Sequence, residues 1–513
     1  MRRGEVDRNK LSPMMKHYVE LKDKYEDTII LYRLGDFYEM FFEDAEVVAH
    51  ALELTLTGKS AGLDEKVPMC GVPFHAADIY IDKLIKKGFK VAICEQLEDP
   101  KFAKGIVKRD VIEVISSGTI ISTNSLNEKE NNYIGCLYDF SYGFVLTYSD
   151  ITTGEIYSEI LENNTDDIVY KLLSLEIKEV ITNSSIDKNL LAKIKSQKIP
   201  VTISDNVLEN DYNNIYQDLS DNRVILSIKM LLYYLSVTQK RNLSHFQKVM
   251  IKKKESFLTM DIHTKRNLEL TECLRTKERN YSLLWLLDNT KTAMGSRKLK
   301  NFIENPLLDV NKINKRYDVV AKLLEEFIIS DELRSDLYEV YDLERLCGRI
   351  SFGSATAKDL LQLKLSLKVL PKIKEKLEKI NFYDRIETLD DLYILLEKAI
   401  YEEPPNSLKE GFLIKEGYSK ELDELKELRR GGKDFISMFE SQERQRTGIK
   451  GLKVGFNKVF GYYIEVSKSY LPLITEEMGY IRKQTLANCE RFITPLLKEK
   501  EDLVLSAEDK IIN

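Results

Sequence analysis

The character of the sequence changes near Phe257, and this change constrains the fold more than any single motif. Before it, short β-rich runs alternate with short amphipathic helices. After it, leucine-spaced helices rich in paired charges dominate, as in residues 357–365 and 415–430. A chain of 513 residues is too long for a single hydrophobic core, so roughly three to five domains are expected. The sequence predicts a multidomain α+β protein.

The first part of the chain predicts a small mixed α/β domain. A β-branched run at 28–34 predicts a strand, and Gly35 supplies a sharp bend after it. A helix is expected to open at Glu43, with acidic residues in its first turn. A second helix is predicted over 76–87, followed by a strand over 89–93.

A second α/β domain is predicted to follow. The runs 133–139 and 144–150 are typical of paired strands, and the stretch 165–204 alternates short helices with apolar runs such as 179–182. A sheet covered by helices on both faces is the expected outcome.

A β-hairpin is predicted at 452–467, inserted between the long helices. Asn457 with Lys458, and Gly461, supply its turn chemistry, and within the hairpin only Glu465 opposes its positive charges. The basic residues in and beside it are Arg444, Arg446, Lys450, Lys453, Lys458 and Lys468. A basic β element on long helical arms suits contact with phosphates, which is salt-dependent and blind to sequence.

Phe37 and Glu39 are the candidate ligand-binding residues, placed at a strand-to-helix turn. In an alternating strand their side chains share one face, so ring and carboxylate approach a target together, and such a pair could wedge into stacked bases. The alternative for Phe37 is a core position, which is the commoner fate of an aromatic residue, and the alternative for Glu39 is a solvated surface acid.

Composition limits the partners. The formal net charge of −6 argues against a protein that simply coats nucleic acid, so any DNA contact must be local. The six cysteines form no C-x-x-C pair and the five histidines show no zinc-ligand spacing, so no metal site is expected. The sequence has no apolar run of membrane-spanning length and no signal peptide, which predicts a cytoplasmic protein.

Two sequence patterns resemble catalytic motifs, but the support for each is weak. Residues 57–60, Thr-Gly-Lys-Ser, imitate the end of a phosphate-binding P-loop, but Glu53 stands where its first glycine is required, so a plain turn is expected. Asp139 and Asp150 raise the alternative of a metal-dependent nuclease. The residues 152–155 after Asp150 instead predict a hairpin turn. No catalytic residue is predicted.

Long matching strings make the chain resemble the bacterial MutS family of DNA mismatch repair proteins over almost its whole length. These strings are 33–41, 68–76, 95–100, 265–270, 294–299, 443–466, 482–486 and 490–494. The resemblance implies the following domains: mismatch recognition (1–117), a linker (118–127), a ribonuclease H-like connector (128–256), an all-α lever (257–440), a clamp (441–500) and the start of a returning lever helix (501–513).

The resemblance also implies roles for individual residues. Phe37 would stack on a mispaired base from the minor groove while Glu39 hydrogen-bonds its edge. Lys453, Asn457 and Lys458 would contact the DNA backbone in the clamp. The implied function is binding of mismatched or unpaired bases in double-stranded DNA to initiate repair; the alternatives are a noncatalytic helical interaction scaffold and the nuclease.

The chain stops at Asn513, before the family's ATPase domain, and contains no true P-loop. We therefore expect a fragment without enzyme activity or cofactor. ATP and magnesium, a homodimer and a MutL-type partner are implied only for a full-length form, which the resemblance places in the bacterial cytoplasm, associated with the nucleoid.

Overall fold

The computed structural model describes residues 3–98, 107–121, 126–209, 211–252, 256–382, 386–405, 413–457, 461–475 and 478–512. The chain divides into two compact units. The first comprises Met1–Ala355 and Val369–Thr388, and the second comprises Thr356–Lys368 and Leu389–Asn513. Each unit is described by itself. Within the described ranges, no helix combines the length and the apolar character needed to cross a membrane.

The first sheet of the first unit has the strand order β3-β4-β2-β1-β5-β6. Its only parallel pair among the described strands is β1 with β5. The strands are β1 (Thr28–Leu34), β2 (Phe37–Phe41), β3 (Thr57–Lys59), β4 (Val67–Pro73), β5 (Lys90–Gln96) and β6 (Arg109–Ile115). The predicted strand at 28–34 is confirmed with the same bounds.

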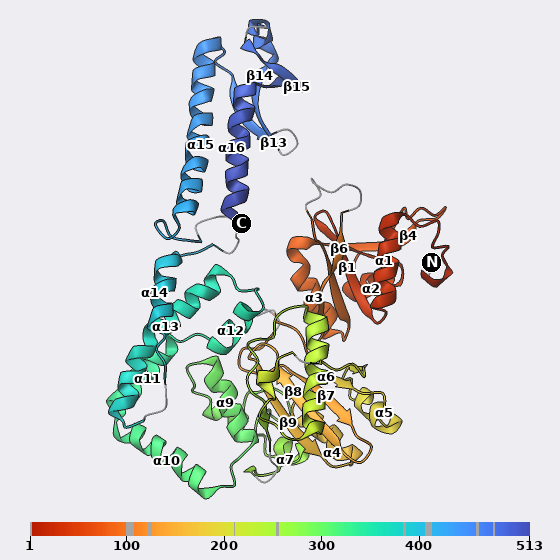
Figure 1. The fold of residues 1–513 in the computed structure, drawn as a ribbon, viewed down its shortest axis with the longest axis vertical. Coiled ribbons are helices and arrows are strands. Elements are labelled where there is room, and N and C mark those ends of the chain that lie inside the picture. The colour runs from red at the N-terminus through yellow and green to blue at the C-terminus, as the bar shows by residue number, and fades with distance from the viewer. Residues whose placement is uncertain are drawn as a thin grey trace. The chain divides into compact units, whose positions relative to one another are not determined.

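Helices cover both faces of this sheet (Figure 1). On one face lies α1 (Pro13–Lys24), whose Tyr18 packs edge-on against Phe41 with 5.0 Å between ring centroids. On the other lie α2 (Phe42–Leu52) and α3 (Ala77–Lys86). The predicted helices and the strand after Gly88 are confirmed within a few residues at each end.

The second sheet has the strand order β11-β10-β7-β8-β9-β12. Its strands are β7 (Tyr133–Asp139), β8 (Phe144–Asp150), β9 (Glu155–Leu161), β10 (Glu179–Thr182), β11 (Val201–Ile203) and β12 (Met250–Ile251). Three of them, β7, β8 and β10, have the predicted bounds.

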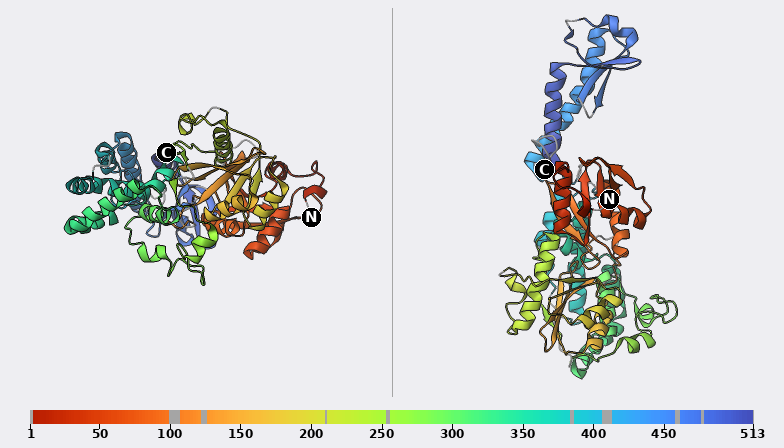
Figure 2. Two further views of the ribbon diagram at one scale, coloured as in Figure 1. Left: turned by 90° about the horizontal axis from the view of Figure 1, so that it is seen from below. Right: turned by 90° about the vertical axis from the view of Figure 1, so that its right-hand side faces the viewer.

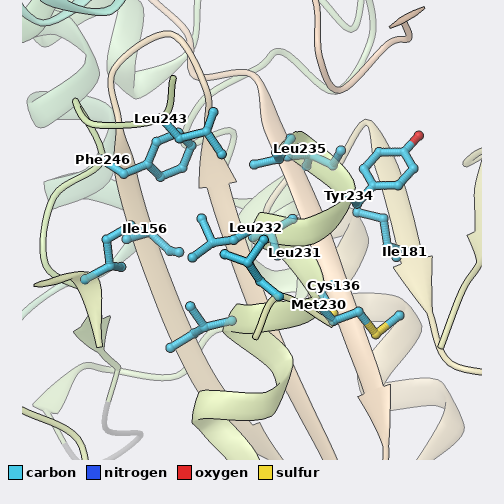
Figure 3. Close-up of a cluster of buried hydrophobic side chains, with 14 of the residues drawn as sticks. Cys136, Ile156, Ile181, Met230, Leu231, Leu232, Tyr234, Leu235, Leu243 and Phe246 are labelled. Atoms are coloured by element: carbon cyan, nitrogen blue, oxygen red, sulfur yellow. The ribbon is translucent and has the colours of Figure 1, made fainter. Parts of the chain in front are cut away.

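The second sheet is covered on both faces, as predicted. Helix α6 (Asn222–Gln239) packs its apolar side chains onto one face (Figure 3). Helices α4 (Thr165–Ser174) and α5 (Lys188–Ser196) cover the other. Asn164 and Asp187 cap these two helices by accepting hydrogen bonds from backbone N–H groups of the first turn.

A buried ion pair joins the two sheets. Lys90, at the start of β5, places its Nζ 2.6 Å from Oε1 of Glu179 on β10, and the Glu179 side chain is fully buried. Tyr234 of α6 donates a hydrogen bond of 2.7 Å to the same oxygen, and Ser116 donates to the other carboxylate oxygen. Burial lowers the pKa of Lys90, but electrostatic interactions with Glu179 and Tyr234 and the hydrogen bonds to both together raise it above its usual value, so the amine stays protonated.

Most of the remaining first unit is helical. Its helices are α7 (Ile262–Asn267), α8 (Leu283–Leu287), α9 (Ala293–Glu304), α10 (Val310–Glu325), α11 (Phe327–Tyr338) and α12 (Leu343–Ser351). Helix α13 (Ala357–Lys379) contributes to both units. A small core forms where Leu333 of α11 meets Val369 and Ile373 of α13.

The second unit consists of two long helices and a small sheet. Helices α15 (Lys420–Thr447) and α16 (Pro495–Ile512) run side by side, and the sheet packs at one end of the pair (Figures 1 and 2). Its strand order is β13-β14-β16-β15. The remaining elements are α14 (Asp390–Ala399), β13 (Lys453–Asn457), β14 (Gly461–Ser467), β15 (Ile481–Thr485) and β16 (Cys489–Ile493). The predicted hairpin is confirmed as β13 and β14.

Carboxylates of α15 and α16 hold this sheet by accepting hydrogen bonds from its backbone. Glu440 of α15 accepts a 2.7 Å hydrogen bond from the backbone N–H of Val454, and Glu501 of α16 accepts one of 2.7 Å from that of Tyr462. Glu501 lies directly against Gly461, where a Cβ would come within 2.0 Å of its Oε1. Gly461 also has φ +77°, which only glycine adopts without strain.

We predict that Gly461→Ala destabilises the sheet by at least about 2 kcal/mol, since it combines left-handed backbone strain with displacement of a buried carboxylate. Hydrogen exchange of the β14 amides measures the effect locally. Gly431→Ala is the matched control: Gly431 lies exposed in α15 with open space around it, so alanine there should be neutral or slightly stabilising. Equal exchange rates in the two variants would contradict this account.

Candidate nucleic-acid interface

The strand β2 presents Phe37 and Glu39 on one face of the first sheet. Gly35, with φ +59°, makes the tight turn between β1 and β2, so the pair lies on the second strand of a hairpin. The predicted strand-to-helix turn is therefore wrong in detail: a full strand separates Gly35 from α2, because β2 pairs with both β1 and β4. The alternation that puts both side chains on one face holds.

Burial increases steeply along this face. The Phe37 side chain is 48% exposed, that of Glu39 is 16% exposed and Phe41 is fully buried beneath α1. The end of β2 at Phe41 is thus anchored in the hydrophobic core, while the Phe37 ring at the other end of the strand is exposed to solvent. The alternative that Phe37 is a core residue is excluded by its exposure.

A second exposed ring lies beside the hairpin. Phe74 begins the short 3-10 helix η2 (Phe74–Ala76) and is 46% exposed. Its backbone N–H donates to the carbonyl oxygen of Asp36 at 2.9 Å, which ties η2 to the β1–β2 turn. The guanidinium carbon of Arg33 lies 3.4 Å from the Phe74 ring centroid, a close cation–π contact.

Arg33 is held from its other side by Glu95 of β5, with 3.2 Å between Nη1 and Oε1. Tyr38 donates its hydroxyl proton to the same carboxylate oxygen. Burial, then the hydrogen bond to Glu95 and the charge of Glu95, raise the pKa of Tyr38 well above its usual value, so this hydroxyl remains a donor. The network fixes Arg33 beneath the exposed Phe74 ring.

Glu39 forms an ion pair with Lys59 of β3. The sequence predicted a plain turn for residues 57–60, and this prediction is wrong: Thr57–Lys59 pairs with Val67–Met69 as the edge strand of the sheet. The segment follows a helix and carries a glycine, so its sequence gives no local signal for a strand. Only pairing in the folded sheet stabilises the strand.

The sequence did not reveal Lys59 as a neighbour of this face, or Arg33 and Phe74 as neighbours of the β1–β2 turn. Arg33 and Phe74 belong to the matching strings 33–41 and 68–76, but the sequence does not show that Phe74 is exposed or that Arg33 stacks on it. Their proximity depends on strand order, which places β4 beside β2 and β3 beyond β4.

The small sheet of the second unit offers a separate basic surface. Lys453 opens β13 and is exposed, while Asn457 ends it and is half-buried; Lys458 lies outside the described residues. Glu465 stands opposite Lys453 in the register but is engaged by Arg491, with 2.9 Å between Oε2 and Nε. Lys453 therefore keeps its charge without an ion pair among the described residues.

Two arginines expected to add to this surface have acidic partners on α15. Arg444 pairs with Glu440 at 2.6 Å, and Arg446 pairs with Glu443 at 2.7 Å. Burial raises the pKa of Glu443, but hydrogen bonds from Arg446 and Tyr480 lower it more, so the carboxylate stays ionised. In the described part of the chain, the exposed bases left without ion pairs here are Lys450, Lys453, Lys468 and Lys483.

The aspartates of the nuclease alternative lie far apart. In the β7–β8 ladder Asp139 pairs with Phe144 and Asp150 with Tyr133, which separates them by six residues, or about 20 Å. Two-metal chemistry needs metal ions about 4 Å apart. Asp150 accepts hydrogen bonds from the backbone of Asn132 and Thr152, and the described ranges contain no cluster of three potential metal ligands. The geometry does not support a nuclease at this pair.

Comparison with known proteins identifies the family. Residues 12–124 match the model described as MutS domain I, and residues 263–505 match MutS domain III. The second sheet lies in residues 125–262, between these two matches.

Three relatives, each named DNA mismatch repair protein MutS, match 98% of this chain. That of Bacillus subtilis (strain 168) is 48% identical over 507 residues, which are 59% of the relative. Those of Alkaliphilus oremlandii (strain OhILAs) and Acetivibrio thermocellus are 48% and 47% identical, and the match covers 60% of each. The chain belongs to the MutS family and spans about three fifths of the length of these relatives.

We predict that Phe37→Ala leaves the stability of the chain almost unchanged, within about 0.5 kcal/mol, because the ring is largely exposed. Phe41→Ala, four residues along the same strand and on the same face, should cost about 3–5 kcal/mol through the cavity it creates. Urea unfolding followed by far-ultraviolet circular dichroism compares the two variants. A large loss of stability in Phe37→Ala would show that the ring belongs to the core.

Proposed function

We propose that the chain binds mismatched or unpaired bases in double-stranded DNA, as the recognition step of DNA mismatch repair. The observation that carries the proposal is the Phe37 ring, 48% exposed at the solvent end of a strand whose other end is buried. An aromatic ring on a rigid strand can enter a base step without a large loss of conformational entropy. The proposal agrees with the printed names of the relatives.

Discrimination in this proposal comes from DNA deformability. A mismatched step has already lost part of its pairing and stacking energy, so inserting Phe37 and kinking the duplex cost less there than at a matched step, where the penalty is a few kcal/mol. Glu39, on the same face as Phe37, would hydrogen-bond the edge of the displaced base.

The small basic sheet would supply affinity without sequence preference. Lys453 and Asn457, together with Lys458 outside the described residues, are the proposed backbone contacts, and the exposed Lys450, Lys468 and Lys483 extend the same charge. With a net charge of −6 for the whole chain, this local basic patch is where phosphates are attracted.

The domain plan implied by the resemblance is part of the proposal: recognition over 1–117, a linker over 118–127, a ribonuclease H-like connector over 128–256, a lever over 257–440, a clamp over 441–500 and a returning lever helix from 501. Binding as proposed is noncatalytic and needs no cofactor from these residues. ATP with magnesium, homodimerisation, a MutL-type partner and association with the bacterial nucleoid are proposed for a longer form.

We predict that the wild-type chain binds a duplex with a G·T mismatch or one unpaired thymine more tightly than the matched duplex. Phe37→Ala should reduce this preference by about 10-fold, the contribution of one stacked base. Mobility-shift titrations measure both ratios. Tyr142→Ala is the control, since it removes a ring that is 70% exposed from the turn between β7 and β8. Equal binding of all duplexes by the wild type would favour the interaction scaffold instead.

Lys453→Ala should weaken binding to matched and mismatched duplexes by the same factor and reduce the slope of log K against log salt by about 1, since one phosphate contact is lost. Lys420→Ala serves as the control, because this side chain is 92% exposed at the start of α15. A loss confined to the mismatched duplex would place Lys453 at the base rather than at the backbone.

A further inference from the structure

The Glu39–Lys59 ion pair connects the proposed base reader to the edge of the first sheet. Glu39 on β2 stands opposite Gly71 on β4, and Lys59 on β3 stands opposite Val67 on the same strand. Because positions 67 and 71 are an even number of residues apart, both side chains lie on one face. The pair therefore reaches from one strand, over β4, to the strand beyond it.

Small and apolar neighbours leave room for this contact. A Cβ at Gly71 would lie 3.3 Å from the carbonyl oxygen of Tyr38, which is tight, and in ordinary contact with Cγ of Glu39 at 3.5 Å. The amine of Lys59 lies 5.6 Å from the ring centroid of buried Phe41, a cation–π contact that steadies its stem. The side chains of Lys59 and Glu39 are only 32% and 16% exposed.

A carboxylate that faces DNA meets an electrostatic penalty. Duplex DNA carries about one negative charge per 1.7 Å of its axis, so an unpaired Glu39 would be repelled. The ion pair with Lys59, made through Oε2 of Glu39, offsets the negative charge of this carboxylate. A carboxylate has two oxygens with about four lone-pair sites, so the other oxygen can still accept a hydrogen bond from a base N–H.

We propose that Lys59 is a positioning residue for mismatch recognition: its ion pair holds Glu39 in place and orients the carboxylate as a hydrogen-bond acceptor for the displaced base. The inference rests on the proposed function and goes beyond it by naming the residue on which the specificity of Glu39 depends. Lys59 acts on the ratio of affinities for mismatched and matched DNA, and it does so through Glu39.

The competing role for Lys59 is a direct phosphate contact, and the two roles give different results. Loss of a phosphate contact weakens matched and mismatched complexes equally and lowers the salt slope by about 1, whatever residue stands at position 39. Loss of a positioning residue lowers the mismatch preference and has no further effect once the carboxylate of Glu39 is gone.

A double-mutant cycle on the whole chain tests the inference, with affinity for matched, G·T and unpaired-thymine duplexes as the readout. We expect Lys59→Met to reduce the mismatch preference about 5-fold or more, and Lys59→Arg to restore most of it. In a Glu39→Gln background, which needs no counter-charge, Lys59→Met should change the preference less than about 2-fold. Lys66→Met, an exposed lysine just before β4, controls for lost charge.

Three outcomes would overturn the inference. The first is an equal loss of affinity on every duplex in both backgrounds, which makes Lys59 a phosphate contact. The second is a mismatch preference that survives Lys59→Met. The third is a wild-type chain without mismatch preference, which overturns the proposed function together with this inference. The wild-type titration separates the third outcome from the first two.

Discussion

Pairing of β2 along both of its edges is the constraint on which the rest of the first sheet depends. Because β1 and β4 hold its backbone in register, the side chains of β2 alternate strictly, and Tyr38 and Met40 are committed to the core beneath α2 and α3. Phe37 and Glu39 are then left on the opposite face. A one-residue slip would exchange the two sets and bury the exposed ring at the expense of the core.

The two units differ in how their charged side chains are paired. In the first, carboxylates are matched to specific cations, Glu39 to Lys59, Glu95 to Arg33 and Glu179 to Lys90, which offsets the electrostatic cost of burying or half-burying these acids. In the second, Arg444 and Arg446 are paired with acids of α15, and lysines around the small sheet have no ion pair in the described ranges. A chain with an acidic balance thus acquires a local basic surface.

The sequence predicted strongly patterned elements well and side-chain partnerships poorly. Strands β1, β7 and β8 have their predicted bounds, because β-branched and apolar runs between turn residues are a local signal. The edge strand β3 was predicted as a turn, since three residues with a central glycine carry no such signal. The partner of Glu39 was missed for the same reason: Lys59 meets it only after β4 has paired on both sides. The role given to Phe37 stays a prediction, and only the fold shows that its ring is exposed.

The anchoring of the small sheet to α15 and α16 through Glu440 and Glu501 has a mechanical consequence. These hydrogen bonds tie the backbone of the sheet to the two helices and restrain its movement relative to them. A helix of 28 residues is about 42 Å long, and a tilt of about 10° at its foot sweeps the far end through about 7 Å. A small change of angle at one end of α15 is thus amplified into a larger displacement of the exposed lysines of the small sheet at its other end.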